Sequence, residues 1–113
     1  GHALKMAKAS NVNLNINSQS IPFITDSYKL VDEGCIPGAA FRNLEYIDKD
    51  VDFHNIDYNL KMIMTDAQTS GGLLMGVKSE VAEEAVKELK SKGLNYTSII
   101  GEVTEGEGRI NIY

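Results

Sequence analysis

The strongest constraint on the fold is a strict alternation of apolar and polar residues near the start of the chain. Val12, Leu14 and Ile16 alternate with asparagines at positions 11, 13, 15 and 17. Successive side chains of a β strand point to opposite faces of the sheet, so this pattern predicts a half-buried strand with its asparagines outward. The asparagines could also form a polar ligand surface, but we favour a solvated strand face.

Three helices are predicted from apolar spacing and from the residues that end them. They cover residues 3–10, a segment that begins at Thr25 or Asp26, and residues 79–92. Gly34 and Gly93 follow the last two helices, where a left-handed residue commonly ends a helix. The 79–92 helix carries one apolar stripe, formed by Val81, Ala82, Ala85, Val86 and Leu89.

Strands and loops complete the expected architecture. We predict strands at residues 44–47 and 73–77, a loop at 35–43, and either a helix turn or a strand entry at 58–64. The β-rich runs 96–103 and 109–113 are split by the turn residues 104–108, which predicts a hairpin. This order of elements predicts an α/β (α+β) fold, a layered α-β-α sandwich with a mixed sheet.

Length and charge argue against several classes of protein. With 113 residues, 42% of them hydrophobic, the chain suits one globular domain. A net charge of −5 argues against a nucleic-acid binder, because contact with the phosphate backbone needs a basic face. No apolar run approaches the roughly 20 residues that span a bilayer, which argues against a membrane protein.

The single cysteine and the two histidines offer little for catalysis or metal binding. Cys35 cannot form an internal disulfide, which favours a reducing cytoplasmic location. It lacks an activating neighbour, so we expect a buried small side chain rather than a nucleophile. His2 and His54 lie far apart in sequence and away from other ligand types, so we predict no metal site.

The first residues, Gly1-His2-Ala3, include neither a methionine nor a signal-peptide pattern. Apolar residues follow a helical rhythm from Leu4 onward. We therefore expect residues 1–113 to be one domain cut from a longer protein, although Gly-His could equally be a tag scar.

A glycine-rich loop, Asp66-Ala67-Gln68-Thr69-Ser70-Gly71-Gly72, is the first candidate site. Consecutive small residues let backbone N–H groups converge, and Thr69 and Ser70 add hydroxyl donors, an arrangement that binds anions and especially phosphate. Asp66 could orient a metal-bound water or cap the loop. Alternatively, Gly71 and Gly72 merely turn the chain into a tight strand, and composition does not decide between these interpretations.

A second candidate site lies at residues 38–43, where Arg42 is the only cation. Arg42 could hold a phosphate through two parallel hydrogen bonds. It could also pair with Glu45 in a surface contact of little energetic value, the interpretation we slightly favour. The chain contains no Walker loop, dinucleotide fingerprint or nucleophile elbow.

Three segments together resemble the selenophosphate synthetase (selenide, water dikinase) family. The family's Asp-Pro-Gln-Thr-Ser-Gly-Gly-Leu-Leu signature is similar to Asp66-Ala67-Gln68-Thr69-Ser70-Gly71-Gly72-Leu73-Leu74. Its Gly-Cys-Val-Pro-Gly-Gly…Arg-Asn segment is similar to Gly34-Cys35-Ile36-Pro37-Gly38, followed by Arg42-Asn43. Its Gly-His…Met-Ala helix is similar to Gly1-His2-Ala3-Leu4-Lys5-Met6-Ala7. Ala67 stands where the family usually has proline, and Ala39 replaces its second glycine.

This resemblance implies the C-terminal domain of an ATP-dependent enzyme, with a fold like that of the aminoimidazole ribonucleotide synthetase C-terminal domain. Family members make selenophosphate, AMP and phosphate from ATP, selenide and water, with magnesium. Their catalytic residues and most ligands of ATP and Mg²⁺ lie in the N-terminal half, so the resemblance implies that this chain alone is inactive. It also implies an N-terminal ATP-binding domain as partner, a homodimer at full length and selenide as substrate.

The candidate residues then form one wall of a cleft that faces the ATP-binding domain. We hypothesise that this wall positions a phosphorylated intermediate or selenide and excludes water. Its residues are Thr69, Ser70, Gly71, Gly72, Asn43, Arg42 and Asp66.

Two alternative functions remain. A sister ATP-dependent enzyme of the aminoimidazole ribonucleotide synthetase or hydrogenase maturation type has a similar Thr-Ser-Gly-Gly loop, but the segment from Gly34 to Gly38 favours the selenium branch. The other alternative is a free-standing binding or assembly module.

Overall fold

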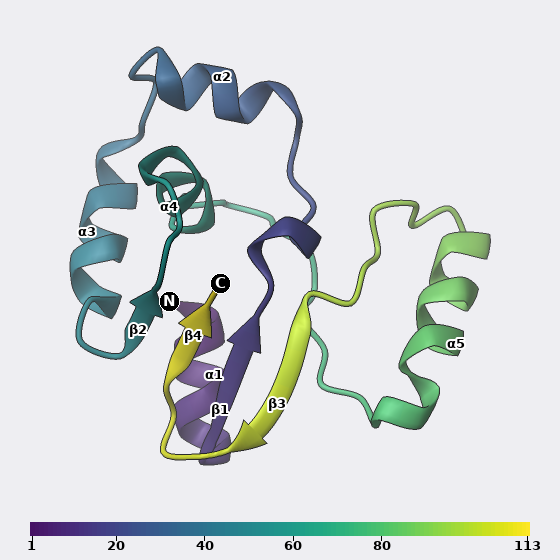
Figure 1. The fold of residues 1–113 in the computed structure, drawn as a ribbon. Coiled ribbons are helices and arrows are strands. Elements are labelled where there is room, and N and C mark those ends of the chain that lie inside the picture. Colours follow the sequence, from purple (N-terminus) through teal and green to yellow (C-terminus); the bar gives the residue numbers. More distant parts are fainter.

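A mixed four-stranded sheet organises the chain in the computed structural model, which describes residues 1–113 (Figure 1). Its strand order is β2-β4-β1-β3, so β1 (Val12–Ile16) is an interior strand. It pairs antiparallel with β3 (Gly101–Glu105) and parallel with β4 (Ile110–Ile112). The fourth strand, β2 (Val51–Phe53), pairs parallel with β4. The structure therefore confirms the predicted first strand and the α/β class with a mixed sheet.

The two faces of β1 differ as the alternation predicts. Leu14 lies opposite Val103 on one side and Ile110 on the other, on the apolar face of the sheet. On the opposite face, the Asn111 Nδ2 donates to Asn15 Oδ1 at 2.8 Å. The asparagines within the sheet thus lie on the face away from the core, where they are half-buried and bond partly to one another.

The predicted hairpin is wrong, although the turn between its two strands is present. Both β3 and β4 hydrogen-bond to β1, which lies between them. The connection crosses the end of β1, where the Arg109 N–H donates to Asn13 Oδ1 at 2.9 Å. Gly108 has a φ of 93°, and a side chain there would meet Lys8 Cα at 2.8 Å. Turn chemistry is local, so it could not reveal a third strand inserted between two neighbours in sequence.

The helix α1 (His2–Ser10) covers the apolar face and confirms the first predicted helix. Leu4 and Ala7 are buried against the strands, and Asn11, with a φ of 51°, turns the chain directly from α1 into β1. A short polar side chain tolerates this left-handed conformation. The core cluster comprises Leu4, Ala7, Leu14, Ile16, Ile47, Val51, Ile110 and Ile112.

Two α helices and a short 3₁₀ helix lie outside this core cluster. The second predicted helix is α2 (Asp26–Asp32), preceded by a short 3₁₀ helix η1 (Ser18–Ser20) and ended by Gly34 at a φ of 85°. The Cys35 N–H donates to Leu30 O at 2.8 Å, so α2 ends in a Schellman motif. The ambiguous segment is a helix, α4 (Tyr58–Met64), whose first turn is capped by Asp57.

The helix α3 (Gly38–Ile47) corrects two predictions at once. Most of the predicted loop 35–43 and all of the predicted strand 44–47 belong to this one helix. Ala40 and Ile47 are both buried, and their spacing of seven residues places them on one helix face. A Pro-Gly pair is typical of a turn, so the sequence predicts a loop and then a strand after Pro37, whereas here the pair starts a helix.

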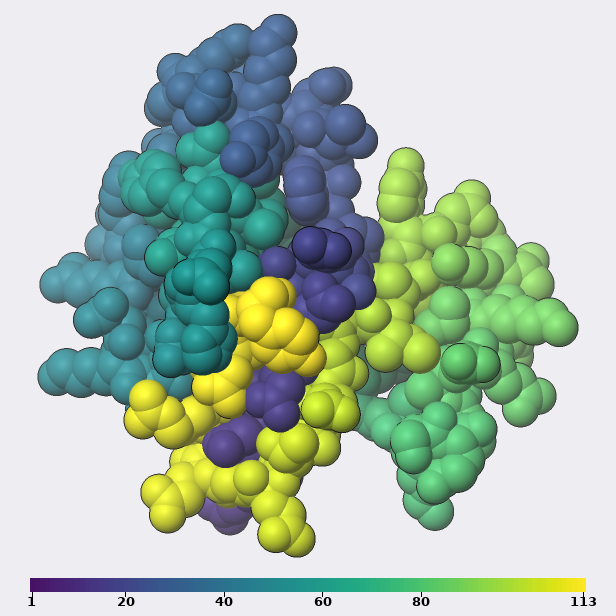
Figure 2. Space-filling view, in the orientation of Figure 1, coloured from purple at the N-terminus to yellow at the C-terminus, as the bar shows by residue number.

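The helix α5 (Ser79–Ser91) confirms the third predicted helix, but it stands apart from the sheet (Figure 1). In the space-filling view its residues form a separate lobe beside β3 (Figure 2). None of its residues is buried. The predicted buried strand 73–77 is also wrong, because these residues form no strand and Leu73 is 92% exposed. Apolar composition alone could not supply a partner strand for this segment.

We expect Leu4→Ala to lower the free energy of unfolding by about 2–5 kcal/mol, because it leaves a cavity beneath the sheet. Leu4 is only 2% exposed. The matched control is Met6→Ala on the same helix, where the side chain is 37% exposed and the expected loss is below about 1 kcal/mol. Urea unfolding of both variants measures the difference, and equal losses would contradict the placement of α1.

Candidate functional site

A hydrogen bond joins the two candidate segments. The Asn43 Nδ2, on α3, donates to Thr65 O at 2.9 Å, at the end of α4 and immediately before Asp66. Thr65 is only 4% exposed, and its Oγ1 donates to Lys61 O at 2.9 Å. These hydrogen bonds hold Thr65 in place, so the position at which the loop leaves α4 is fixed. Thr65 could not be identified from the sequence, because its role depends on a backbone carbonyl that carries no sequence signature.

The loop at residues 66–72 is exposed throughout. The Asp66 N–H donates to Ile63 O at 3.2 Å, but no backbone N–H from Ala67 to Gly72 donates to another backbone group. The structure places no strand after Gly71 and Gly72, and neither glycine has a positive φ. The interpretation of these glycines as a tight turn into a strand is therefore wrong. What remains is an exposed run of hydrogen-bond donors.

Arg42 lies on a helix rather than in a loop. Its Nη1 donates to Gly38 O at 3.3 Å, and the predicted ion pair with Glu45 does not form. Adjacent residues of an α helix point about 100° apart, given 3.6 residues per turn. Asn43 consequently faces α4 while Arg42 extends into solvent, so the two predicted site residues serve different surfaces.

A cavity of about 680 Å³ borders the first candidate loop and residues 35–37, which immediately precede the second candidate site. Its lining is mostly apolar and comes from α2, α4, the sheet and the segment between α2 and α3. Cys35 and Pro37 line one part, while Asp66 and Gln68 line another. The two motif segments thus border one space, although they are separated by about thirty residues in sequence.

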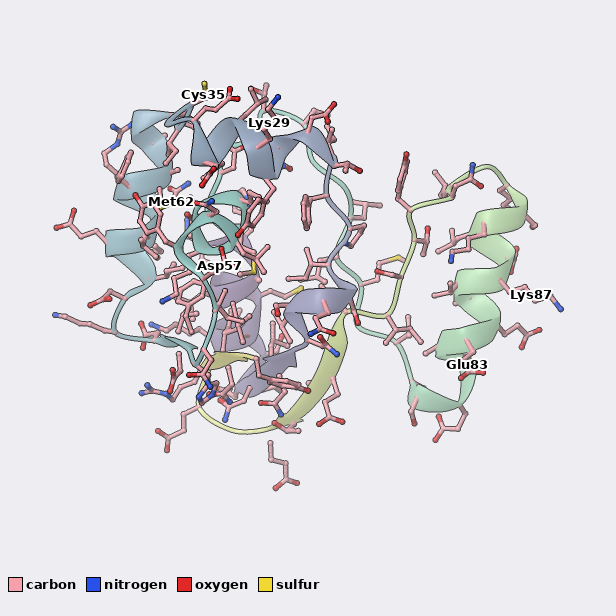
Figure 3. The ribbon with its side chains drawn as sticks, turned by 45° about the horizontal axis from the view of Figure 1, so that its top comes forward. Lys29, Cys35, Asp57, Met62, Glu83 and Lys87 are labelled. Atoms are coloured by element: carbon pink, nitrogen blue, oxygen red, sulfur yellow. The ribbon has the colours of Figure 1, made fainter.

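Cys35 is exposed, contrary to the expectation of a buried side chain. Its sulfur lies at the outer edge of the molecule in Figure 3. The reason is its position as the third residue after α2, where the Schellman motif directs the chain away from the helix.

Electrostatic contacts brace α2 against α4, the two helices beside this cavity. The Tyr28 hydroxyl donates to Asp57 Oδ1 at 3.0 Å, and the Leu60 N–H donates to the same oxygen at 3.0 Å. The hydrogen bond from the Leu60 N–H is the main cause that lowers the pKa of Asp57 below its usual value. The carboxylate of Asp57 in turn raises the pKa of Tyr28, because its hydroxyl proton is held in the hydrogen bond.

The acidic, cysteine and histidine side chains do not gather into a metal site. No group of three or more such residues lies close enough to hold a metal ion. His54 Nδ1 lies 3.8 Å from Asp52 Oδ1, and both side chains are about half exposed. No helix combines the length and the apolar character that crossing a membrane requires.

With this geometry in place, comparison with known proteins defines the class. Residues 1–112 match the family described as AIR synthase related protein, C-terminal domain. Because the match covers nearly every residue, the chain belongs to this family.

The curated relatives with similar sequences share one name within this family. The chain is 43% identical to a selenide, water dikinase of Clostridioides difficile (strain 630) over 99% of its length. It is 45% identical to a selenide, water dikinase of Porphyromonas gingivalis (strain W83) over 95% of its length, and 33% identical to one of Rhizobium meliloti (strain 1021) over 99%. The matched part is 33%, 31% and 32% of these relatives, so the chain spans about a third of their length.

We expect Asp57→Ala to lower the free energy of unfolding by about 1 kcal/mol at pH 7, because it removes the cap of α4. The pKa of Asp57 is depressed in the folded state, so its charge stabilises fully above the unfolded value of about 4. That contribution is lost as the pH falls through the folded pKa.

The matched variant is Asp57→Asn, which keeps a capping side chain without a titrating group. Unfolding measured from pH 7 to pH 2 should show the gap in stability between the parent chain and the Asp57→Asn variant narrowing in acid. A gap that stays constant across this range would contradict the assigned pKa direction.

Proposed function

We propose that residues 1–113 form a single domain, the C-terminal domain of a selenide, water dikinase. Two facts support this proposal: the family match over residues 1–112 and the identity of 43–45% to relatives of that name. The reaction proposed for the longer enzyme converts ATP, selenide and water into selenophosphate, AMP and phosphate. Its selenide substrate, homodimeric state and cytoplasmic location are parts of the same proposal.

The residues of this chain do not fit a site for ATP with Mg²⁺. Magnesium takes oxygen ligands in octahedral geometry, and no cluster of three candidate ligands is present. No phosphate-binding Walker loop precedes a helix in the sequence. ATP and Mg²⁺ would therefore be held mainly by the N-terminal ATP-binding domain, the partner of this domain in the same chain.

The contribution of this domain is a wall of hydrogen-bond donors. The observation that carries the proposal is the run of backbone N–H groups from Ala67 to Gly72 that have no backbone acceptor in the chain. With the hydroxyls of Thr69 and Ser70, they can bind the oxygens of a phosphorylated intermediate. Each hydrogen bond to a charged group contributes about 1.5–3 kcal/mol, so several of these donors together can hold such an anion.

Three further residues belong to the proposed site: two lie beside the loop and one lies on the outer surface of α3. Asn43 is a positioning residue, since its bond to Thr65 O fixes where the loop leaves α4. Asp66 follows at the start of the loop and borders the cavity. Arg42 offers an exposed guanidinium that can approach an anion brought by the ATP-binding domain.

A sister ATP-dependent enzyme is the second candidate, because the matched family is named for AIR synthase. The relatives named above favour the selenium enzyme, as does the segment from Gly34 to Gly38. Assay of the longer enzyme with selenide and with aminoimidazole ribonucleotide precursors distinguishes the two.

We expect the double variant Thr69→Ala/Ser70→Ala in the longer enzyme to lower kcat for selenophosphate formation at least about tenfold, the effect of losing about 1.4 kcal/mol. Phosphorus NMR of the products measures it.

The matched control is Thr25→Ala/Ser79→Ala, which also removes one threonine and one serine hydroxyl, but at exposed positions outside the wall. Its turnover should stay within about twofold of the parent. The proposed role is wrong if the Thr69→Ala/Ser70→Ala variant also retains parental turnover.

A further inference from the structure

Gln68 is the one long polar side chain between Ala67 and Gly72, and it lies over the backbone of its own loop. A Cβ atom at position 71 would lie 2.9 Å from Gln68 Oε1, closer than non-bonded atoms pack. At position 72, by contrast, nothing lies within 4 Å of the corresponding point. Gly71 has no positive φ, so its backbone conformation does not require glycine. The Gln68 amide therefore occupies the space that a side chain at position 71 would need.

The Gln68 amide has no hydrogen-bond partner within the chain. A glutamine amide carries one acceptor oxygen and two N–H donors on one planar group. Because Oε1 is turned toward Gly71, Nε2 is turned away from it and its two donors stay free. Gln68 thus adds side-chain donors to a loop whose backbone N–H groups also lack backbone acceptors.

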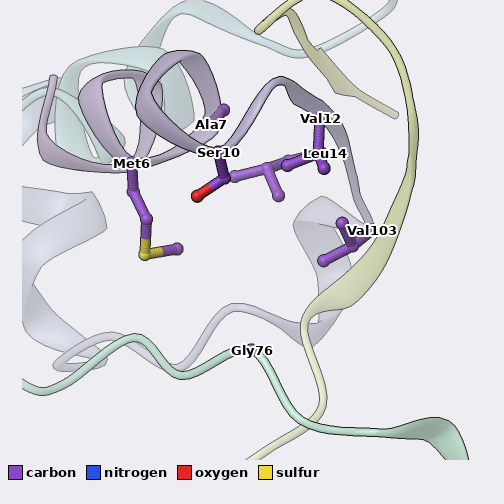
Figure 4. A pocket seen from close by; sticks show the side chains of 7 residues that line it. All are labelled: Met6, Ala7, Ser10, Val12, Leu14, Gly76 and Val103. Atoms are coloured by element: carbon purple, nitrogen blue, oxygen red, sulfur yellow. The ribbon is translucent and has the colours of Figure 1, made fainter.

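The position of Gln68 at the larger cavity gives these donors a place to act. Gln68 and Asp66 line the cavity of about 680 Å³, which is otherwise mostly apolar. The Asp66 carboxylate only accepts hydrogen bonds, so of these two residues Gln68 alone can donate to an anion. The cavity of about 270 Å³ provides the contrast, since Ser10 is its one polar lining side chain (Figure 4). An anion leaving water needs donors to replace its hydration, and Gln68 supplies them at the edge of the larger cavity.

We propose that Gln68 is a further anion-binding residue of the loop. Its Nε2 donates to the same phosphate-like oxyanion as the backbone N–H groups of residues 67–72, and the absent side chain of Gly71 leaves room for the amide to do so. This inference rests on the proposed function, because it adds one ligand-binding side chain to the wall of hydrogen-bond donors.

Titration of the ¹⁵N-labelled chain with inorganic phosphate tests the contact through the side-chain NH₂ resonances of its two glutamines. We expect a saturable shift of the Gln68 NH₂ pair, with the same dissociation constant that the loop backbone amides report. Gln19, exposed in η1, is the internal control, and its NH₂ pair should stay in place.

We expect Gln68→Ala to raise the dissociation constant for phosphate about tenfold, because it removes a hydrogen bond to a charged group. The matched variant is Gln19→Ala, which removes the same side chain at an exposed position outside the loop and should stay within about twofold of the parent.

Gly71→Ala tests the room that the glycine leaves. Its methyl group takes the space of the Gln68 amide, and only the flexible end of that side chain has to move, so the variant should fold. We expect it to weaken phosphate binding in the parent chain but to have no further effect in the Gln68→Ala variant, since both changes remove the same contact. Losses that simply add would overturn the proposal.

The titration separates failure of this inference from failure of the proposed function. If the loop backbone amides shift while the Gln68 NH₂ pair does not, and Gln68→Ala keeps the parental dissociation constant, the role of Gln68 is wrong and the wall of donors stands. If neither the backbone amides nor the NH₂ pair shifts, both proposals are wrong.

Discussion

The position of β1 between a parallel and an antiparallel neighbour determines the rest of this structure. Leu14 contacts β3 through its register with Val103 and contacts β4 through its register with Ile110. Both edges of β1 are paired, so only its apolar face needs a further covering element. The helix α1 covers this face, because the left-handed Asn11 joins α1 directly to β1. The other strands are placed relative to β1, because β3 and β4 pair with it directly and β2 pairs with β4.

The features that could be predicted from the sequence are those fixed by local physics. The alternation around Leu14 identified the central strand and its polar face. Gly34 and Gly93 marked helix ends, and both adopt the left-handed φ that only glycine accepts easily. Longer-range features could not be obtained in this way. The hairpin was inferred from a real turn, but β1 lies between its strands, and the Pro37-Gly38 pair starts a helix instead of lying within a loop.

The exposed donors of the candidate loop were predictable from its composition, but the connections of the loop were not. The small polar composition of the loop indicated hydrogen-bond donors, and its donors are indeed exposed and free of backbone acceptors. The bond between Asn43 and Thr65 O could not be foreseen, since an amide finds a carbonyl only after α3 and α4 have packed. Arg42 shows the opposite case: it is predicted for the same wall as Asn43, but helical geometry directs the two side chains to different surfaces.

The central claim is that the loop at residues 66–72 presents its donors to an oxyanion. Titration of the ¹⁵N-labelled chain with inorganic phosphate, followed by two-dimensional NMR, tests it most directly. We expect saturable shifts of the Thr69, Ser70, Gly71 and Gly72 amide resonances, while the Gly106 and Gly108 amides in the β3–β4 turn stay in place. Absence of shifts at the loop, or shifts of equal size at both sets of amides, would contradict the claim.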